Sequence, residues 1–326
     1  MTFLTSIIGL CMESDILFSM YFGAKKYEKM KISFFVSIGI LSIILEVICF
    51  LLLKYILVWL QIPQVIYNQT AKYLQIIFIG IILTFIYNYF AAMLRALGNS
   101  KIPLIFLGIA TIVNVVLDIV FVLYVHLGVA GAAYATIISQ AISAFGLALY
   151  VLLLKKEILP QRKHYIFDQH IFKKLKDYSL MTCLQQGIMN FGILMIQGLV
   201  NSFGIAVMSA FSAAVKIDSF AYMPVQDFGN AFSTFVAQNK GANEEKRIQD
   251  GLKIASLMAL VFCIFISLGV CIFSKELMML FVSKMNIIKI GMVYLRVEGS
   301  FYIGIGCLFL LYGYYRGVGK MKMSLI

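Results

Sequence analysis

Polar side chains occupy one face of an otherwise apolar segment in the first half of the chain. Thr111, Asn114 and Asp118 are spaced i, i+3 and i+7, which places them on the same side of a helix. Thr136 stands about seven residues into the next apolar segment, which runs the opposite way, so we expect its hydroxyl near the depth of Asp118. A carboxylate, an amide carbonyl and a hydroxyl are hard oxygen ligands for a small cation such as Na⁺, or for a proton on Asp118. The alternative is that Asp118 is a buried, hydrogen-bonded structural residue.

Other charged side chains also lie inside apolar segments, where a charge costs about 2.5–3.5 kcal/mol at a helix centre. We interpret three of them as lining a cavity or the substrate path: Asp218, Asp227 and Glu298. Asp227 follows Pro224 by three residues, and a proline interrupts the hydrogen-bond ladder of a helix. For the first and third residues the alternative is neutralisation by a basic neighbour two positions away, Lys216 and Arg296 respectively.

The composition indicates which elements position these residues. Of the 326 residues 62% are hydrophobic and only 13% charged, and the mean hydropathy is +0.94, far from the range of soluble domains. Continuous apolar runs of about 20 residues predict transmembrane helices and exclude β-barrel strands. We predict an all-α polytopic membrane protein with nine spans, at 3–22, 32–60, 70–95, 102–126, 129–154, 178–203, 206–239, 251–274 and 288–316.

The basic residues alternate between the two sides of these spans. One set of loops holds 20 of the 27 Lys and Arg residues, and the opposite set holds five. The positive-inside rule assigns the first set to the cytoplasm, so residue 1 is predicted to face outside. This topology accounts for the net charge of +12, and we therefore expect no nucleic-acid partner.

The motifs of several enzyme classes are absent from the sequence. It contains no GxxxxGK[ST], no HExxH and no DxxxD or DDxxD, and its six cysteines form no CxxC pair. We expect no enzyme activity, no cofactor and no metal beyond a Na⁺ at Asp118. Transport driven by an ion gradient is the class that remains.

The chain reads as two helical lobes, 1–154 and 178–326, joined by a polar cytoplasmic linker at 155–177. A repeat at a shift of 221 residues places 94–105 on 315–326, and Gly23-Ala24 falls on Gly241-Ala242 at a shift of 218. Both copies put these loops inside, which predicts a parallel repeat about an axis along the membrane normal. The complete pattern is six helices plus six, so we expect nine of twelve here, with the first helix and the last two missing.

Three stretches resemble the multidrug and toxic compound extrusion (MATE) transporters, in their prokaryotic DinF-like branch. "LRALGNSKIPLIFLGIATIVNVVLDIVFV" and "HLGVAGAAYATIISQ" are similar to the family's fourth to sixth helices, and "FSAAVKIDSFAYMPVQDFGNAFSTFVAQNKGA" to its eighth. The resemblance implies a MOP-superfamily fold in the cell (plasma) membrane and export of organic, often cationic drugs in exchange for H⁺ or Na⁺. It also implies a cation site that matches Asn114, Asp118 and Thr136. The family's remaining ligand, an Asp on the first helix, has no counterpart in this chain.

Two other interpretations stay open at this point. A flippase for lipid-linked precursors shares the two-lobe fold, but it is expected to have a cationic cavity, whereas the interior charges here are mostly acidic. The second is a fragment of a transporter that does not transport. For the transporter we expect drugs, the coupling ion and membrane lipids as partners, and a monomer.

Overall fold

The computed structural model describes residues 14–38 and 64–324, and every regular element in this part of the chain is helical. Six of its helices are long and apolar enough to cross a membrane, and a seventh is added if a bent pair near the C-terminus is one span. The predicted all-α membrane class is thereby confirmed. The predicted spans 3–22 and 32–60 lie mostly outside the described residues.

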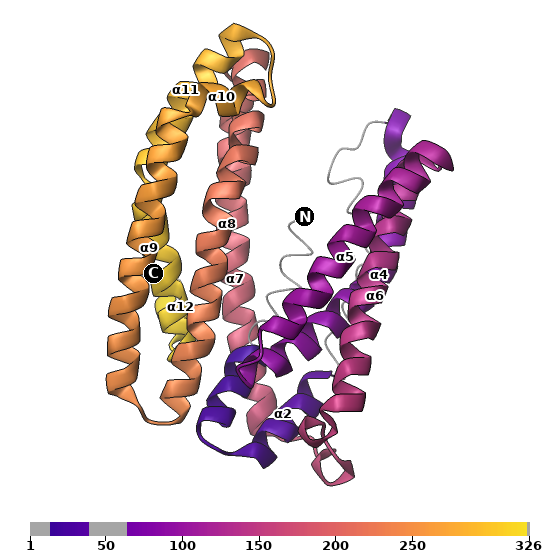
Figure 1. The fold of residues 1–326 in the computed structure, drawn as a ribbon, viewed down its shortest axis with the longest axis vertical. Coiled ribbons are helices and arrows are strands. Elements are labelled where there is room, and N and C mark those ends of the chain that lie inside the picture. The colour runs from indigo at the N-terminus through magenta and orange to yellow at the C-terminus, as the bar shows by residue number, and fades with distance from the viewer. Residues whose placement is uncertain (1–13, 39–63, 325–326) are drawn as a thin grey trace. The chain divides into compact units, whose positions relative to one another are not determined.

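Residues 1–183 form the first of two compact units, called unit 1. Its α6 packs against both α4 and α5 (Figure 1). Its described elements are a helix over 14–23, α2 (Tyr27–Ile38), α4 (Gln64–Ala96), α5 (Lys101–Ile119), the π-helix η1 (Val120–Tyr124), α6 (Gly128–Leu154), the 3-10 turns η2 (Lys156–Ile158) and η3 (Arg162–His164), and the start of α7 (Gln169–Asn201).

An aromatic core joins the helix over 14–23 to α2 and α4. The rings of Phe18 and Phe34 meet edge to face with their centroids 4.3 Å apart, and the hydroxyl of Tyr89 donates to the backbone carbonyl of Phe34 at 2.9 Å. Nearby, Nε of Arg95 donates to Oδ2 of Asp15 at 3.0 Å. Burial of these rings and the charged pair fixes the end of unit 1 where the 155–177 linker begins.

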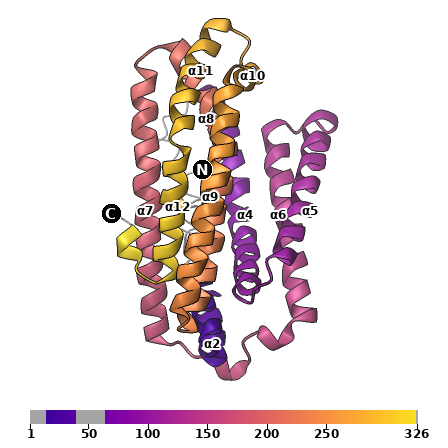
Figure 2. The ribbon, with the colours of Figure 1, turned by 60° about the vertical axis from the view of Figure 1, so that its left-hand side comes forward.

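Residues 184–326 form unit 2. In it α12 packs along α8 and α9, and Figure 2 shows α12 beside α9. Helices α12 and α8 approach closely at Gly313, because this residue has no Cβ; a Cβ there would collide with the backbone carbonyl of Gly229. Glycine has this role frequently between membrane helices. Its elements are the rest of α7, α8 (Ile205–Gly241), α9 (Glu245–Ile272), α10 (Ser274–Met279), α11 (Met285–Ser300), α12 (Tyr302–Gly317) and the 3-10 turn η4 (Met321–Ser324).

The predicted single helix at 288–316 is wrong. It is the pair α11 and α12, which bend by 49° at Phe301. Gly299 and Ser300 precede the bend, and Gly/Ser pairs are frequent sites of sharp kinks. The hydroxyl of Ser267 donates to the carbonyl of Gly299 at 2.5 Å, so a side chain from α9 satisfies backbone at the break.

The helix predicted at 178–203 begins nine residues earlier, at Gln169. Ile171 and Leu175 are buried against Leu17 and Val36 of unit 1. Because these two apolar side chains are four residues apart, helix formation places both on the face that contacts the core. Nine of the 23 residues predicted as a polar linker, 169–177, therefore form the beginning of α7.

The backbone repeats at the turns that the sequence repeat relates. Gly98 and Gly319 both have positive φ, 82° and 79°, and their amides donate to the carbonyls of Arg95 and Arg316 at 2.8 and 2.9 Å. At the shift of 218 the residues that follow the aligned Gly-Ala pairs also share a positive φ. They are Lys25, with a φ of 55°, and Asn243, with a φ of 59°. These matching helix ends support the duplication.

Candidate functional site

The α5–α6 hairpin fixes the depth of the predicted cation ligands. A Cβ at Gly146 would meet the ring of Phe106, and a Cβ at Gly131 would meet Cβ of Phe121. From the first contact to the second, the chain moves fifteen residues back along α6 and fifteen residues forward through α5 and η1. The two helices are therefore antiparallel and keep one register between these contacts. In that register Thr136 lies opposite position 116, between Asn114 and Asp118, which supports the predicted depth.

Asn114 and Asp118 lie one turn apart and each has an enclosed polar atom without a hydrogen bond. These atoms are Nδ2 of Asn114 and Oδ1 of Asp118, and they have no partner among the described residues. Enclosed polar atoms are nearly always hydrogen-bonded in proteins, so two on neighbouring turns indicate a place for a further group. The hydroxyl of Thr136 donates to the carbonyl of Ala132 at 2.9 Å, which leaves its oxygen able to accept or to coordinate.

A change in helix type follows Asp118 directly. The α-helix ends at Ile119 and a π-helical turn covers Val120–Tyr124, where the sequence predicted a regular helix to residue 126. Single π-helical turns are rare in proteins, and many of those that occur are at functional sites. Within residues 14–38 and 64–324 no group of three or more His, Cys, Asp or Glu side chains could hold a metal ion.

Unit 2 contains a second polar cluster, at the break between α11 and α12. Asp218 of α8 is 3% exposed, and its Oδ1 accepts a 2.5 Å hydrogen bond from the hydroxyl of Tyr302, the first residue of α12. The carboxyl of Glu298 is its neighbour, and the Tyr294 side chain interacts with Glu298. Discontinuous membrane helices frequently form the sites of transporters.

The structure brings Asp218 and Glu298 together, and their place on a substrate path stays a prediction. Oδ2 of Asp218 and Oε2 of Glu298 are enclosed and accept no hydrogen bond from a donor group of the described residues, but the two carboxyls lie within hydrogen-bond reach of each other if one of them carries a proton. Among the described residues no ion pair within 4.0 Å joins either acid to its basic neighbour. Instead Nε of Arg296 donates to the hydroxyl of Ser274 at 3.1 Å, and Lys216 lies over the ring of Phe281.

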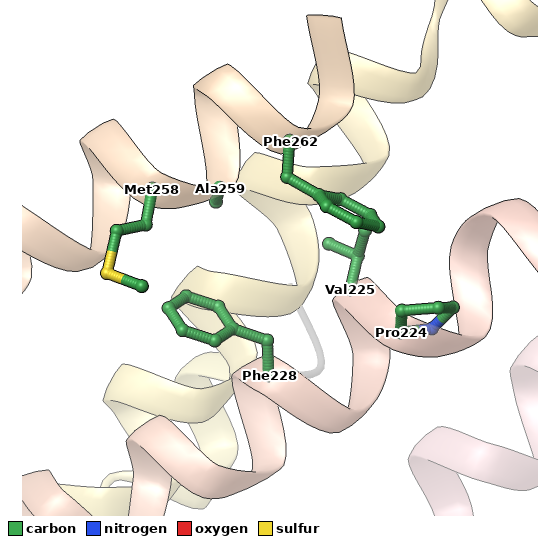
Figure 3. A pocket seen from close by; sticks show the side chains of 6 residues that line it. All are labelled: Pro224, Val225, Phe228, Met258, Ala259 and Phe262. Carbon is green, nitrogen blue, oxygen red and sulfur yellow. The ribbon is translucent and has the colours of Figure 1, made fainter. Parts of the chain in front are cut away.

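Asp227 is apart from this pair. It lies nine residues after Asp218 on α8, about 13 Å along the helix, and its side chain interacts with Asn230, which accepts from Nη1 of Arg316 at 2.9 Å. It does not line the neighbouring apolar cavity between α8 and α9. That cavity has a volume of about 240 Å³ and is lined by Pro224, Val225, Phe228, Met258, Ala259 and Phe262 (Figure 3).

Two features of the site were missed from the sequence. The roles of Tyr294 and Tyr302 depend on the break at Phe301, which the Gly299–Ser300 pair could have indicated. The π turn after Asp118 has no comparable signal, because Val120–Tyr124 reads as an ordinary apolar helix.

Comparison with known proteins gives a consistent result. The MatE family model matches residues 1–120 and 177–326. "Probable multidrug resistance protein YpnP" of Bacillus subtilis is 32% identical over 85% of this chain and 62% of its own length, and "Probable multidrug resistance protein YoeA" of the same organism is 26% identical over 87% and 64%.

Solved structures share the fold. The Vibrio cholerae MATE transporter VcmN in its bent form superposes with a TM-score of 0.88 at 22% identity, over 99% of this chain and 74% of that one. The chain spans less than two thirds of the length of the curated relatives that it matches. The family match covers most of the chain, and this chain belongs to the MatE family of multi-pass cell-membrane transporters.

Proposed function

We propose that this chain exports small organic compounds by alternating access, driven by H⁺ or Na⁺ that binds at Asp118. One observation carries the proposal: the enclosed Oδ1 of Asp118 accepts no hydrogen bond from the described residues, and it lies one turn from Asn114 and near the depth of the Thr136 hydroxyl. A proton or a Na⁺ on the carboxylate would neutralise its charge, and a charge is costly inside a membrane span. The chemistry is binding and conformational change, without an enzymatic step or a cofactor.

The coupling requires that the ion and the organic compound favour different conformations. An ion shifts this equilibrium only by its difference in affinity for the two states. The carboxyl pair Asp218 and Glu298 is proposed to lie on the path of the organic compound, where acidic groups attract cationic molecules. The acidic character of both polar clusters favours this interpretation over a flippase for pyrophosphate-linked lipids, which needs cationic groups.

Transport by the purified chain in lipid vesicles tests the proposal. A fluorescent organic cation is followed without a gradient, with a pH gradient and with a Na⁺ gradient of the same size. We expect net movement of the dye against its concentration gradient with at least one of the two ions. Dye movement that is identical under all three conditions would reject ion-coupled export and favour the fragment interpretation.

A further inference from the structure

Three consecutive apolar side chains are exposed in the segment between α6 and α7. Tyr165, Ile166 and Phe167 are 55%, 57% and 52% exposed, and they are called the apolar triad below. An exposed run of three large apolar residues is unfavourable in water and indicates a contact with something else. The triad lies outside the predicted spans, so the apolar core of the bilayer does not by itself account for it.

The triad and the residue before it contact α2. The ring of Tyr165 stacks on that of Phe35, with centroids 5.0 Å apart, and Nε2 of the buried His164 lies 2.8 Å from Oε2 of Glu28. Glu28 lies in the first turn of α2, and Phe35 lies three residues past residue 32, the predicted start of the membrane span. From the predicted start of that span we expect the triad near the height where headgroups meet acyl chains.

Basic side chains surround the triad. Arg162 precedes it, and Lys173 and Lys176 follow it on the first turns of α7; all three are exposed. Asp168 lies between these basic residues in the sequence, and its carboxylate caps the start of α7. Its Oδ1 accepts hydrogen bonds from the backbone amides of residues 170 and 171 at 2.8 and 3.0 Å. Aromatic and aliphatic side chains flanked by cations are typical of segments that bind anionic membrane surfaces.

We propose that the apolar triad inserts into the cytoplasmic leaflet and that Arg162 and Lys173 bind the headgroups of anionic phospholipids there. The surface anchors unit 1 beside the segment that joins it to unit 2. Together the two side chains are expected to enrich anionic lipid at the triad by roughly fivefold, the factor that corresponds to about 1 kcal/mol of net attraction. The proposal is independent of which ion drives transport.

Quenching of a tryptophan by brominated lipids tests this directly. Trp59, the single tryptophan of the chain, is replaced by Phe, and Ile166→Trp is introduced. The protein is placed in vesicles with equal amounts of phosphatidylglycerol and phosphatidylcholine, in which only one of the two lipids carries bromine on its acyl chains. We expect quenching by both, with the ratio favouring brominated phosphatidylglycerol by roughly fivefold.

Matched variants separate this interaction from the general attraction of a basic protein. Arg162→Gln with Lys173→Gln should bring the ratio close to one, whereas Lys246→Gln with Arg247→Gln removes the same two residue types from unit 2 and should leave it unchanged. Tyr124→Trp, at the opposite end of unit 1, should be quenched equally by both lipids.

Three results would overturn the proposal. The first is an Ile166→Trp protein whose fluorescence neither lipid quenches, which indicates that protein or water covers this position. The second is equal quenching of the Ile166→Trp protein by both lipids. The third is an unchanged ratio after Arg162→Gln with Lys173→Gln.

Discussion

Asn114 and Asp118 lie one helical turn apart on α5, and each has an enclosed polar side-chain atom that makes no hydrogen bond with the described residues. Thr136, on α6, lies at the depth between them. A cation or a proton at this place would neutralise the negative charge of the Asp118 carboxylate, and Asn114 and Thr136 would bind a cation through their amide and hydroxyl oxygens. The roles of the two neutral residues follow from this arrangement.

Asn114→Ala and Thr136→Ala should each raise the driving-ion concentration for half-maximal efflux by up to about tenfold. Each variant removes one neutral ligand and leaves the carboxylate, whose Coulomb attraction is the larger contribution. The measurement is dye efflux from vesicles across a series of ion concentrations. Thr111→Ala is the control, because that hydroxyl is exposed and donates to the carbonyl of Leu107; an equal effect in this variant would contradict the assignment.

Tyr302→Phe should lower the free energy of unfolding by about 1–3 kcal/mol. The variant removes the hydroxyl that donates to the buried Asp218 and leaves that acceptor without a partner. The check is the unfolding midpoint of the purified protein in detergent. Tyr124→Phe, which removes an exposed hydroxyl, should have little effect. Equal midpoints for the two variants would show that the hydrogen bond contributes nothing to stability.

Gly98→Ala and Gly319→Ala should each destabilise the protein by about 1–2 kcal/mol. Both glycines have φ near +80°, a conformation that costs a residue with a Cβ about this much. Gly304→Ala is the matched control, since a Cβ there meets nothing within 4 Å and φ is ordinary; alanine should be neutral or stabilising. A destabilising Gly304→Ala with neutral turn variants would refute the role given to the turns.

Glu28 should make the 160–168 segment sensitive to acid. The hydrogen bond from Lys163, then that from His164, lowers the pKa of this carboxyl. Because the folded-state pKa is lowered, the stabilisation is complete above the usual Glu pKa of about 4.3 and is lost as the pH falls through the lower folded value.

Hydrogen exchange of the 160–168 segment, corrected for intrinsic rates, should therefore rise in that acidic window. Glu28→Gln should show faster exchange already at neutral pH. Glu157→Gln, in the same linker, should behave as the wild type. If hydrogen exchange in Glu28→Gln is as slow as in the wild type, the contacts of Glu28 with His164 and Lys163 do not order the linker.

The fold was predictable where apolar runs and turn residues are strong signals. The helix starting at Gly128 and the turns at Gly98 and Gly319 correspond to their sequence patterns, because a long apolar run must satisfy its backbone internally in a membrane. The early start of α7 was not predictable, since Ile171 and Leu175 become helical by packing on Leu17 and Val36. Such tertiary contacts have no local pattern.

The candidate site was predictable to a similar extent. The spacing of Asn114 and Asp118 indicated one helix face, and the hairpin direction indicated the depth of Thr136. The meeting of Asp218 with Tyr302 depends on a helix break and on contact between α8 and α12. Residues 84 positions apart in the sequence come together only through this packing.

Efflux by Asp118→Asn tests the central claim most directly. The variant keeps the size of the side chain and removes the charge that is proposed to bind the driving ion. Ion-driven efflux of a fluorescent organic cation from vesicles should fall to the rate of protein-free vesicles at equal protein content, whereas Asp250→Asn, on the exposed start of α9, should retain the wild-type rate. Wild-type efflux by Asp118→Asn would show that the carboxylate is structural and would contradict the proposed function of this site.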